Sequence, residues 1–179
     1  GGVAPAALAV RGNTDIGGNS LIDSRSDNSC GPKAGSWSRD NTEQGGASKV
    51  YGYGDDVKNT MVNYSVNPQG DIVRNVPDAI FDTFTYSPDE LDALKAIAKA
   101  NGTYYKGDIL FNSSNKIPNG LIFVDTVSGN NITPSTPSSD FASLRISGNA
   151  PEHVDSATGH PTFQGWIVVN GSARIDGTF

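Results

Sequence analysis

The sequence predicts a mainly β protein whose fold is a right-handed parallel β-helix (solenoid) with irregular rungs, long loops and one docked α-helix at about residues 88–100. Two observations lead to this prediction. Aliphatic and aromatic residues occur in short groups separated by turn formers, with 21 glycines and 10 prolines among 179 residues, which indicates many short strands and not disorder. In addition, one short unit recurs along the chain. We therefore interpret residues 1–179 as a single solenoid domain and as a fragment of a longer protein.

The recurring unit is an apolar triplet, a polar residue, a glycine, three further residues, an isoleucine, one residue and a second glycine. Its triplet predicts a short strand whose alternate side chains point inward. A single unit cannot bury its apolar face, whereas stacked units bury a continuous core and pair their backbones with the units above and below. Complete or partial copies occur at residues 8–18, 120–125, 143–148, 165–170 and 167–177.

Glycines mark the turns of each unit. Gly12 and Gly171 follow the first strand, and we expect both at positive φ because the chain must turn there. A second short strand then presents one isoleucine to the core, at Ile16, Ile146 or Ile175. The glycines expected to end this strand are Gly18, Gly148 and Gly177.

One segment predicts a helix. Ser87 as the N-cap, Pro88 at the first position and Glu90 as the capping-box partner mark its start, and Asn101-Gly102 marks its end. We expect its apolar stripe to dock on a flank of the stack or to cover one end, with partner binding as the alternative role. The stripe consists of Leu91, Leu94, Ile97 and Ala98.

Residues 24–49 are polar, rich in glycine and serine, and nearly free of aliphatic side chains. They predict a long surface loop. Shorter loops are expected at residues 134–140 and 150–161, whereas the alternation in Met61–Val66 predicts a strand.

Charge and cysteine content restrict the function. The net charge of −6 and the absence of a basic run argue against a nucleic-acid surface. Cys30 is the only cysteine, so the chain forms no internal disulfide and no CxxC or zinc-ribbon site. No apolar stretch is long enough to span a bilayer. We expect membrane attachment only through an anchor upstream of this fragment.

The residues that could carry catalysis or bind a metal are few. His153 and His160 are the only histidines, and with Asp155 and Ser156 they lie in one short loop, which does not favour a nucleophilic triad. The same histidines with Asp155 are an alternative metal site, although their spacing fixes no ligand geometry. Asp55-Asp56 is an alternative calcium site, with a solvated turn as the default. We expect no catalytic residue, no metal and no cofactor.

Aromatic and charged residues leave two further alternatives. Trp37, Tyr51 and Tyr53 could stack on a sugar ring, or Trp37 could anchor the predicted loop. Arg145 and Arg174 occupy equivalent positions in the repeat. The fold itself does not decide function. If Asp15 and Asp176 lie on the same face as the two arginines, a polysaccharide-active enzyme on this fold is favoured. Trp166 replaces Leu121 of a related unit, so we expect it to be packed.

Residues 163–179 resemble the rungs with the pattern Gly-hydrophobic-Val-Val-x-Gly-x-x-x-Ile-x-Gly of PilX-type pilus assembly proteins, which are minor-pilin-like proteins of type IV pilus systems. Residues 7–21 are similar to the same rungs. The order of features is also similar to that family: an early rung, a long polar loop, a helix near residues 91–100, the Tyr104-Tyr105 pair and returning rungs.

This resemblance implies an upstream pilin-like helix in the membrane and a β-rich part in the periplasm or on the cell surface. It implies a role in assembling, initiating or decorating pili, with adhesion as a consequence, and no catalytic residues. Other pilins or pilus-assembly proteins are the implied partners. The chain lacks the pilin-like helix and the cysteine pair that many pilins have.

We therefore expect a non-catalytic structural or interaction ectodomain of a pilus-assembly or cell-surface protein. The alternatives are a carbohydrate-binding adhesin that recognises surface glycans, a polysaccharide lyase or hydrolase on the same fold, and a polymerising cytoplasmic scaffold similar to bactofilins. The irregular spacing of the repeats argues against the last of these.

Overall fold

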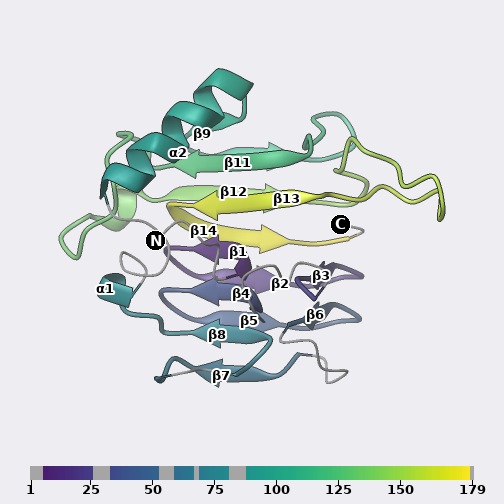
Figure 1. Cartoon of the computed structure of the whole chain (residues 1–179), viewed down its shortest axis with the longest axis horizontal. Coiled ribbons are helices and arrows are strands. Elements are labelled where there is room, and N and C mark those ends of the chain that lie inside the picture. The colour runs from purple at the N-terminus through teal and green to yellow at the C-terminus, as the bar shows by residue number, and fades with distance from the viewer. Residues whose placement is uncertain (1–5, 26–32, 53–58, 67–68, 81–87, 178–179) are drawn as a thin grey trace.

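The structure, a computed structural model, is mainly β and its sheets are parallel (Figure 1). It describes residues 6–25, 33–52, 59–66, 69–80 and 88–177. Within these ranges no helix has the length and apolar character needed to cross a membrane. The helical elements are α1 (Asp78–Ile80), α2 (Pro88–Asn101) and the 3-10 turn η2 (Ser138–Asp140).

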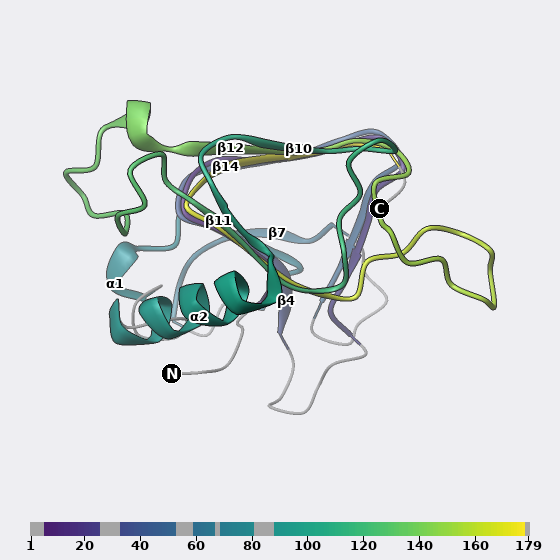
Figure 2. The same cartoon turned by 90° about the horizontal axis from the view of Figure 1, so that it is seen from above.

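Three sheets contain the strands, and every strand pair in them is parallel. Viewed from above, strands of one sheet superpose and outline a three-sided section (Figure 2). The seven-stranded sheet has the order β7 (Met61–Asn63), β8 (Ile72–Arg74), β4 (Ala34–Ser38), β1 (Ala6–Val10), β13 (Gly165–Val169), β11 (Gly120–Asp125) and β9 (Tyr104–Lys106). The five-stranded sheet has the order β10 (Ile109–Phe111), β12 (Ala142–Ile146), β14 (Gly171–Ile175), β2 (Thr14–Ile16) and β5 (Thr42–Gln44). The two-stranded sheet pairs β3 (Leu21–Asp23) with β6 (Lys49–Tyr51).

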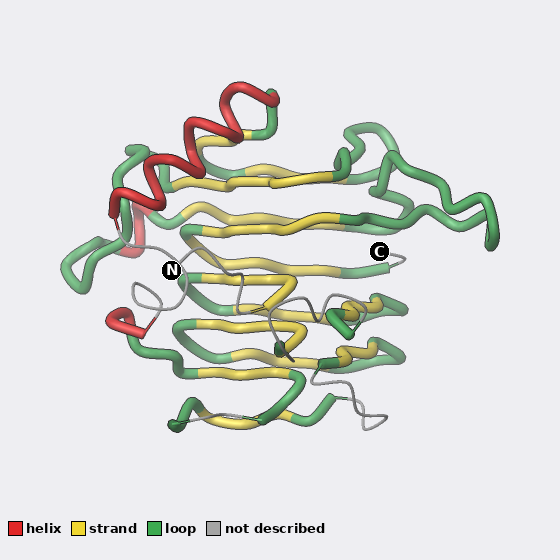
Figure 3. Tube along the Cα trace, viewed as in Figure 1, coloured by secondary structure: helices red, strands yellow, loops and turns green. Residues whose placement is uncertain are grey.

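The order of strands in space differs from their order in the chain. The first strand, β1, lies in the middle of its sheet between β4 and β13. From β1 the chain adds β4, then forms β7 at the edge and returns to place β8 between β7 and β4. After the helices it resumes at β9, at the opposite end of the same sheet (Figure 3). The strands that follow then return toward the middle. The last two strands, β13 and β14, therefore stack directly on β1 and β2.

The register of these strands confirms the alignment of the repeat units. Leu8 pairs with Ile167, and Leu121 pairs with Trp166. In the five-stranded sheet, Ile146 pairs with Ile175, which in turn pairs with Ile16. All three isoleucines are fully buried in one central apolar cluster. The inward position predicted for them is confirmed.

A second apolar row lines the outer face of the seven-stranded sheet. Phe123, Val168, Ala9, Trp37 and Val73 follow one another in register along this face. Helix α2 covers the Phe123 and Val168 end of the row. The predicted docking of the helix on a flank is confirmed, because α2 packs against β9 and β11.

The stripe by which α2 docks differs from the predicted one. Leu91, Leu94 and Ala98 pack against the sheet as expected, but Ile97 points outward and is 51% exposed. Lys95 takes the buried position in its place, at 8% exposure. Residues 91, 94, 95 and 98 form a continuous helical face, and Lys95 joins it because its ammonium group finds a buried carboxylate, described below. The predicted N-cap residue Ser87 lies outside the described ranges.

The prediction of a surface loop over residues 24–49 is wrong. This segment contains β4, β5 and the start of β6. Several of its buried polar side chains have hydrogen-bonded hydroxyl groups: Ser38 and Thr42 bond each other at 2.7 Å, and Ser48 donates to the Gly45 carbonyl. The strand predicted at Met61–Val66 is confirmed as the shorter β7.

Gly18, Gly148 and Gly177 follow the ends of β2, β12 and β14, as predicted, whereas the positive φ predicted for Gly12 and Gly171 is wrong. Gly18 and Gly177 have φ of 61° and 75°. Gly12 and Gly171 do not have positive φ, and neither does Gly148. Gly12 and Gly171 are instead required because neighbouring layers approach each other too closely there for a side chain.

Candidate functional site

A row of charged residues runs along the outer face of the five-stranded sheet. Arg145, Arg174, Asp15 and Glu43 are consecutive in register on β12, β14, β2 and β5. Arg174 also forms an ion pair with Asp176 at 3.0 Å. The structure therefore brings together the two arginines and two aspartates that the sequence singled out. We call these five residues the charged row.

A shallow polar groove of about 480 Å³ lies over part of the charged row, where Asp15, Glu43 and Arg174 line it. Its charged lining consists of the Arg174 guanidinium and the carboxylates of Asp15 and Glu43. Asp15 and Glu43 are neighbours on the same exposed face. The condition given above for a polysaccharide-active enzyme, that Asp15 and Asp176 join the two arginines, is therefore met, and the arrangement does not decide between catalysis and binding. The groove is lined by Asn13, Thr14, Asp15, Asn41, Glu43, Ser143, Ser172, Ala173 and Arg174.

A larger pocket, of about 600 Å³, lies beside β3. Leu21, Ile22 and Asp23 line one side of it, and residues 163–167 line the other. Leu8 and Ile175 belong to the central apolar cluster and also line this pocket. The pocket is therefore bordered by a strand edge and has apolar residues in its lining.

The backbone N–H and C=O groups of β3 point alternately toward β6 and away from it. Lys49 N donates to Ser20 O at 2.8 Å, and Ser24 N donates to Tyr51 O at 3.2 Å, so Ser20 and Ser24 face β6. Backbone groups alternate in direction along a parallel strand, so the N–H and C=O groups of Leu21 and Asp23 face the opposite side. No strand in the described ranges pairs with that side, which borders the pocket.

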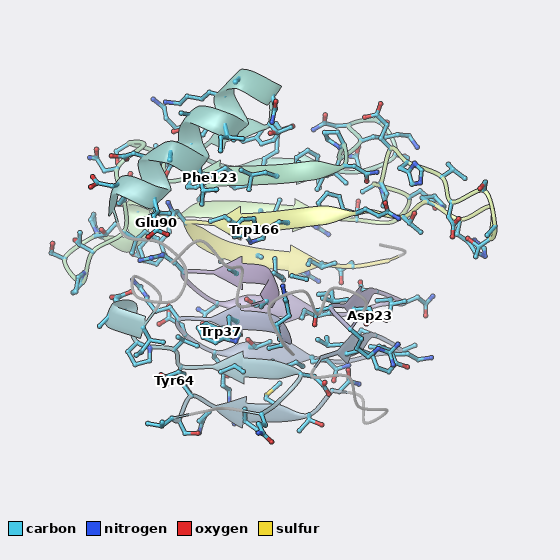
Figure 4. The ribbon with its side chains drawn as sticks, viewed as in Figure 1. Asp23, Trp37, Tyr64, Glu90, Phe123 and Trp166 are labelled. Carbon is cyan, nitrogen blue, oxygen red and sulfur yellow. The ribbon has the colours of Figure 1, made fainter. Side chains whose placement is uncertain are left out.

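Trp37 is buried and does not join Tyr51. Trp37 lies on the seven-stranded sheet at 5% exposure, with its ring at 6.3 Å from the ring of Tyr64 (Figure 4). This burial argues against stacking on a sugar, because a buried ring offers no open face. Trp37 anchors strand β4 in the sheet and not the loop that was predicted. Tyr51 lies on β6, where the Arg25 guanidinium is 3.8 Å from its ring centroid. Tyr53 lies outside the described ranges.

Arg25 also holds the carboxylate of Asp23 at the rim of the larger pocket. Its Nε and Nη2 atoms donate to the two carboxylate oxygens at 2.9 and 2.8 Å. These hydrogen bonds lower the pKa of Asp23, against the opposing effect of burial. Asp23 is therefore a fixed anion at this rim.

The histidine loop folds on itself. Asp155 N donates to His160 O at 3.0 Å, and Thr162 N donates to His153 O at 2.9 Å. Across the described part of the chain, no group of three potential ligands could hold a metal ion. Asp55, Asp56 and Cys30 lie outside that part.

Sequence reasoning missed a buried polar cluster at the end of β11. Asp125 is fully buried. Its Oδ2 accepts hydrogen bonds from Lys95 Nζ at 2.8 Å and from Tyr104 OH at 2.7 Å. Its Oδ1 accepts from Asn170 Nδ2 and from Thr126 N, both at 2.9 Å. The repeat alignment held a signal for part of this cluster, because it places Asp125 opposite Asn170.

The phenol of Tyr104 is held neutral in this cluster. Burial is the main cause that raises its pKa above the ordinary value of 10.0, and the hydrogen bond to Asp125 and the negative charge of that residue act in the same direction. The folded state thus favours the neutral phenol. Its contribution to stability is complete below pH 10 and is lost as the pH rises from 10 toward the folded-state pKa.

We expect Tyr104→Phe to reduce the loss of stability at high pH. Urea unfolding at about pH 8 and about pH 11 measures this loss in both proteins. The wild type should lose more free energy of unfolding between these values than the variant. The pKa of Tyr105 is also raised by burial. Tyr105 is present in both proteins, so its contribution to the loss of stability is the same in both and does not affect their difference. Equal losses would contradict the assignment to Tyr104.

Comparisons of the chain with protein-family models, with curated proteins and with solved structures gave no match.

Proposed function

We propose that the chain is a non-catalytic interaction module of a pilus-assembly or cell-surface protein, built as a right-handed parallel β-helix. The parallel register across three sheets and the stacking of repeat units support this architecture. The similarity of residues 163–179 to PilX-type rungs supports the biological setting. The module then lies in the periplasm or on the cell surface, anchored through an upstream segment, with other pilus-assembly proteins as partners.

One observation carries the proposed mode of action: among the described residues no strand pairs with the side of β3 that borders the larger pocket. Such a side is a template for strand addition, in which an extended segment of a partner supplies main-chain hydrogen bonds. The Leu21 and Asp23 backbone groups face this position. A partner strand parallel to β3 bonds both residues through the N–H and C=O groups of its central residue.

The chain itself indicates which partner sequence fits. In β3 and β6 the central residue is a buried aliphatic, Ile22 or Val50, and the first residue is exposed. A strand added beside β3 continues this pattern and places its central side chain beside Ile22 and Ile175. The partner is thus an extended segment with a β-branched aliphatic residue between two polar or exposed ones.

A peptide with the sequence of residues 46–52, which already has the β6 pattern, is a direct probe. We expect it to shift the NMR amide signals of Leu21 and Asp23 when it is titrated into the protein. N-methylation of its central valine removes the N–H that faces β3, and binding should be lost. N-methylation of the preceding lysine is the matched control, because that amide faces away. Equal binding by both methylated peptides would contradict strand addition.

The biological setting is tested in the native host. Deletion of the gene should remove pili and motility, and the wild-type gene should restore them. Leu21→Pro removes one N–H on the unpaired side of β3 and should fail to restore pili. Leu21→Ala keeps the N–H and should restore them. Normal pili after deletion would overturn the pilus role, and equal restoration by both variants would overturn the role of this edge.

The charged row favours a second candidate function, the binding of a surface glycan. Arginine and carboxylate side chains along a polar groove supply hydrogen bonds to sugar hydroxyl and acidic groups. We expect Arg145→Ser with Arg174→Ser to abolish retention on immobilised glycans. Trp37→Ala, made in the same assay, tests the sequence-based alternative. Retention that survives the double substitution would exclude the charged row as the binding surface.

A further inference from the structure

The buried cluster around Asp125 combines three groups that can react with one another. Lys95 supplies an amine, Asn170 a carboxamide and Asp125 a carboxylate. Asp125 and Asn170 are fully buried, and Lys95 is 8% exposed. The Asp125 carboxylate lies between the other two, with one oxygen bonded to Lys95 Nζ at 2.8 Å and the other to Asn170 Nδ2 at 2.9 Å.

Two features of this cluster are costly as they stand. An ion pair between Lys95 and Asp125 lies away from water, where desolvation offsets much of the attraction between the charges. In addition, Asn170 Oδ1 is buried and has no hydrogen-bond partner among the described residues, although a buried acceptor of this kind is destabilising. A purely structural role for the Lys95–Asp125 ion pair explains neither the burial of the two charges nor the unpaired oxygen of Asn170.

We propose that Lys95 and Asn170 form an intramolecular isopeptide bond, with Asp125 as the proton acceptor. The surroundings suit such a reaction, because apolar groups exclude water from it. The ring of Phe123 lies 5.7 Å from Lys95 Nζ, and Val168 and Leu91 pack around that ring. A carboxylate in a water-poor site accepts a proton from an ammonium group more readily than in water.

The reaction consumes no reagent outside the cluster. Lys95 Nζ gives one proton to Asp125 Oδ2 along their hydrogen bond, and its lone pair then attacks Cγ of Asn170. The new Nζ–Cγ bond forms as the Cγ–Nδ2 bond breaks. A second proton passes from Nζ to Nδ2, which leaves as ammonia. The products are a secondary amide, ammonia and a neutral Asp125 carboxyl group, so charge and atoms balance.

The lysine must approach Asn170 for this attack, since reacting atoms need to lie within about 3–3.5 Å. Its Nζ now also donates to Gly129 O at 3.0 Å, a bond that it must release. The flexible side chain permits this movement while Asp125 keeps hold of the amine.

The product removes both costly features. The buried ion pair becomes a neutral amide and a neutral carboxyl group. When the carboxyl proton of Asp125 moves from Oδ2 to Oδ1, the oxygen that faces residue 170, it can donate to the former Asn170 Oδ1 and give the unpaired acceptor a partner. The bond also ties α2 to the turn between β13 and β14, and so joins the helix covalently to the last repeat unit.

Intact-mass measurement of the purified, denatured protein tests the proposal. We expect the mass to lie about 17 Da, one ammonia, below the mass of the sequence. Trypsin digestion should release a branched peptide in which residues 75–99 are joined to residues 146–174, because a modified Lys95 is no longer cleaved. A mass equal to that of the sequence, with both peptides recovered separately, would overturn the proposal.

Variants separate this bond from two other reactions. Cyclisation of Asn170 onto Gly171 also releases ammonia, but it yields no branched peptide and persists in Lys95→Arg, whereas the isopeptide bond is lost there. Asp125→Ala should likewise abolish the bond and Tyr104→Phe should retain it. A loss of about 18 Da with the branch at residues 117–145 would make Asp125 the acyl partner and overturn the assignment to Asn170.

Discussion

Replacement of Ile175 by aspartate is expected to abolish cooperative folding. Ile175 lies on β14 between Ile146 and Ile16, and all three are fully buried. Aspartate at this position places a charge in the central apolar cluster without a partner, which costs about 4 kcal/mol or more. That is a large fraction of the stability of an ordinary domain.

Thermal unfolding followed by circular dichroism measures this effect. The variant should show no cooperative transition. Arg174→Ser is the matched control, because Arg174 is the preceding residue and its side chain is 57% exposed, so this variant should melt close to the wild type. A variant with aspartate at 175 that melts like the wild type would contradict the inward position of this row.

Much of the stacking could be predicted from the sequence because alignment of repeat units is equivalent to register in a parallel sheet. The gap-free match of residues 8–18 with residues 167–177 reappears as the pairing of β1 with β13 and of β2 with β14. The apolar triplets predict which residues form strands and which of their side chains point inward. The helix was predictable for a separate reason, since its end signals and apolar spacing are local.

The segment of residues 24–49 could not be predicted because its inward side chains are hydroxyl groups. Ser36, Ser38 and Thr42 are fully or nearly fully buried, a pattern that hydropathy assigns to a loop. In a stack, the unit below supplies a backbone to pair with, so a short polar strand needs little apolar burial of its own. Only Trp37 signalled packing, and one aromatic residue does not define a strand.

The candidate sites were predictable only where the repeat itself carries them. Alignment placed Arg145 opposite Arg174, and the register confirms this pairing and adds Asp15. The approach of Lys95 to Asp125 depends on the docking angle of α2, which no local pattern encodes. The unpaired side of β3 likewise depends on the order in which separate units stack.

Gly171→Ala is expected to disrupt the stack severely. A Cβ atom at Gly171 would fall on the backbone carbonyl group of Ala142 in the next layer, and a Cβ at Gly12 would meet the carbonyl group of Gly171 in the same way. Both neighbours are backbone atoms held by parallel pairing, so relief requires separation of the layers. We expect a loss on the order of 3 kcal/mol or more in the free energy of unfolding.

Gly148→Ala is the matched control for this prediction. Gly148 also lies at a turn of the same repeat, but a Cβ there meets no atom within 4 Å and φ is not in the left-handed region. Alanine restricts the unfolded chain more than glycine does, so this variant should be as stable as the wild type or more stable by about 0.4–1 kcal/mol. Urea unfolding of both variants measures the difference. If Gly171→Ala unfolds at the same urea concentration as Gly148→Ala, the layers are not in close contact at Gly171. Close packing is then not the reason for a glycine at this position.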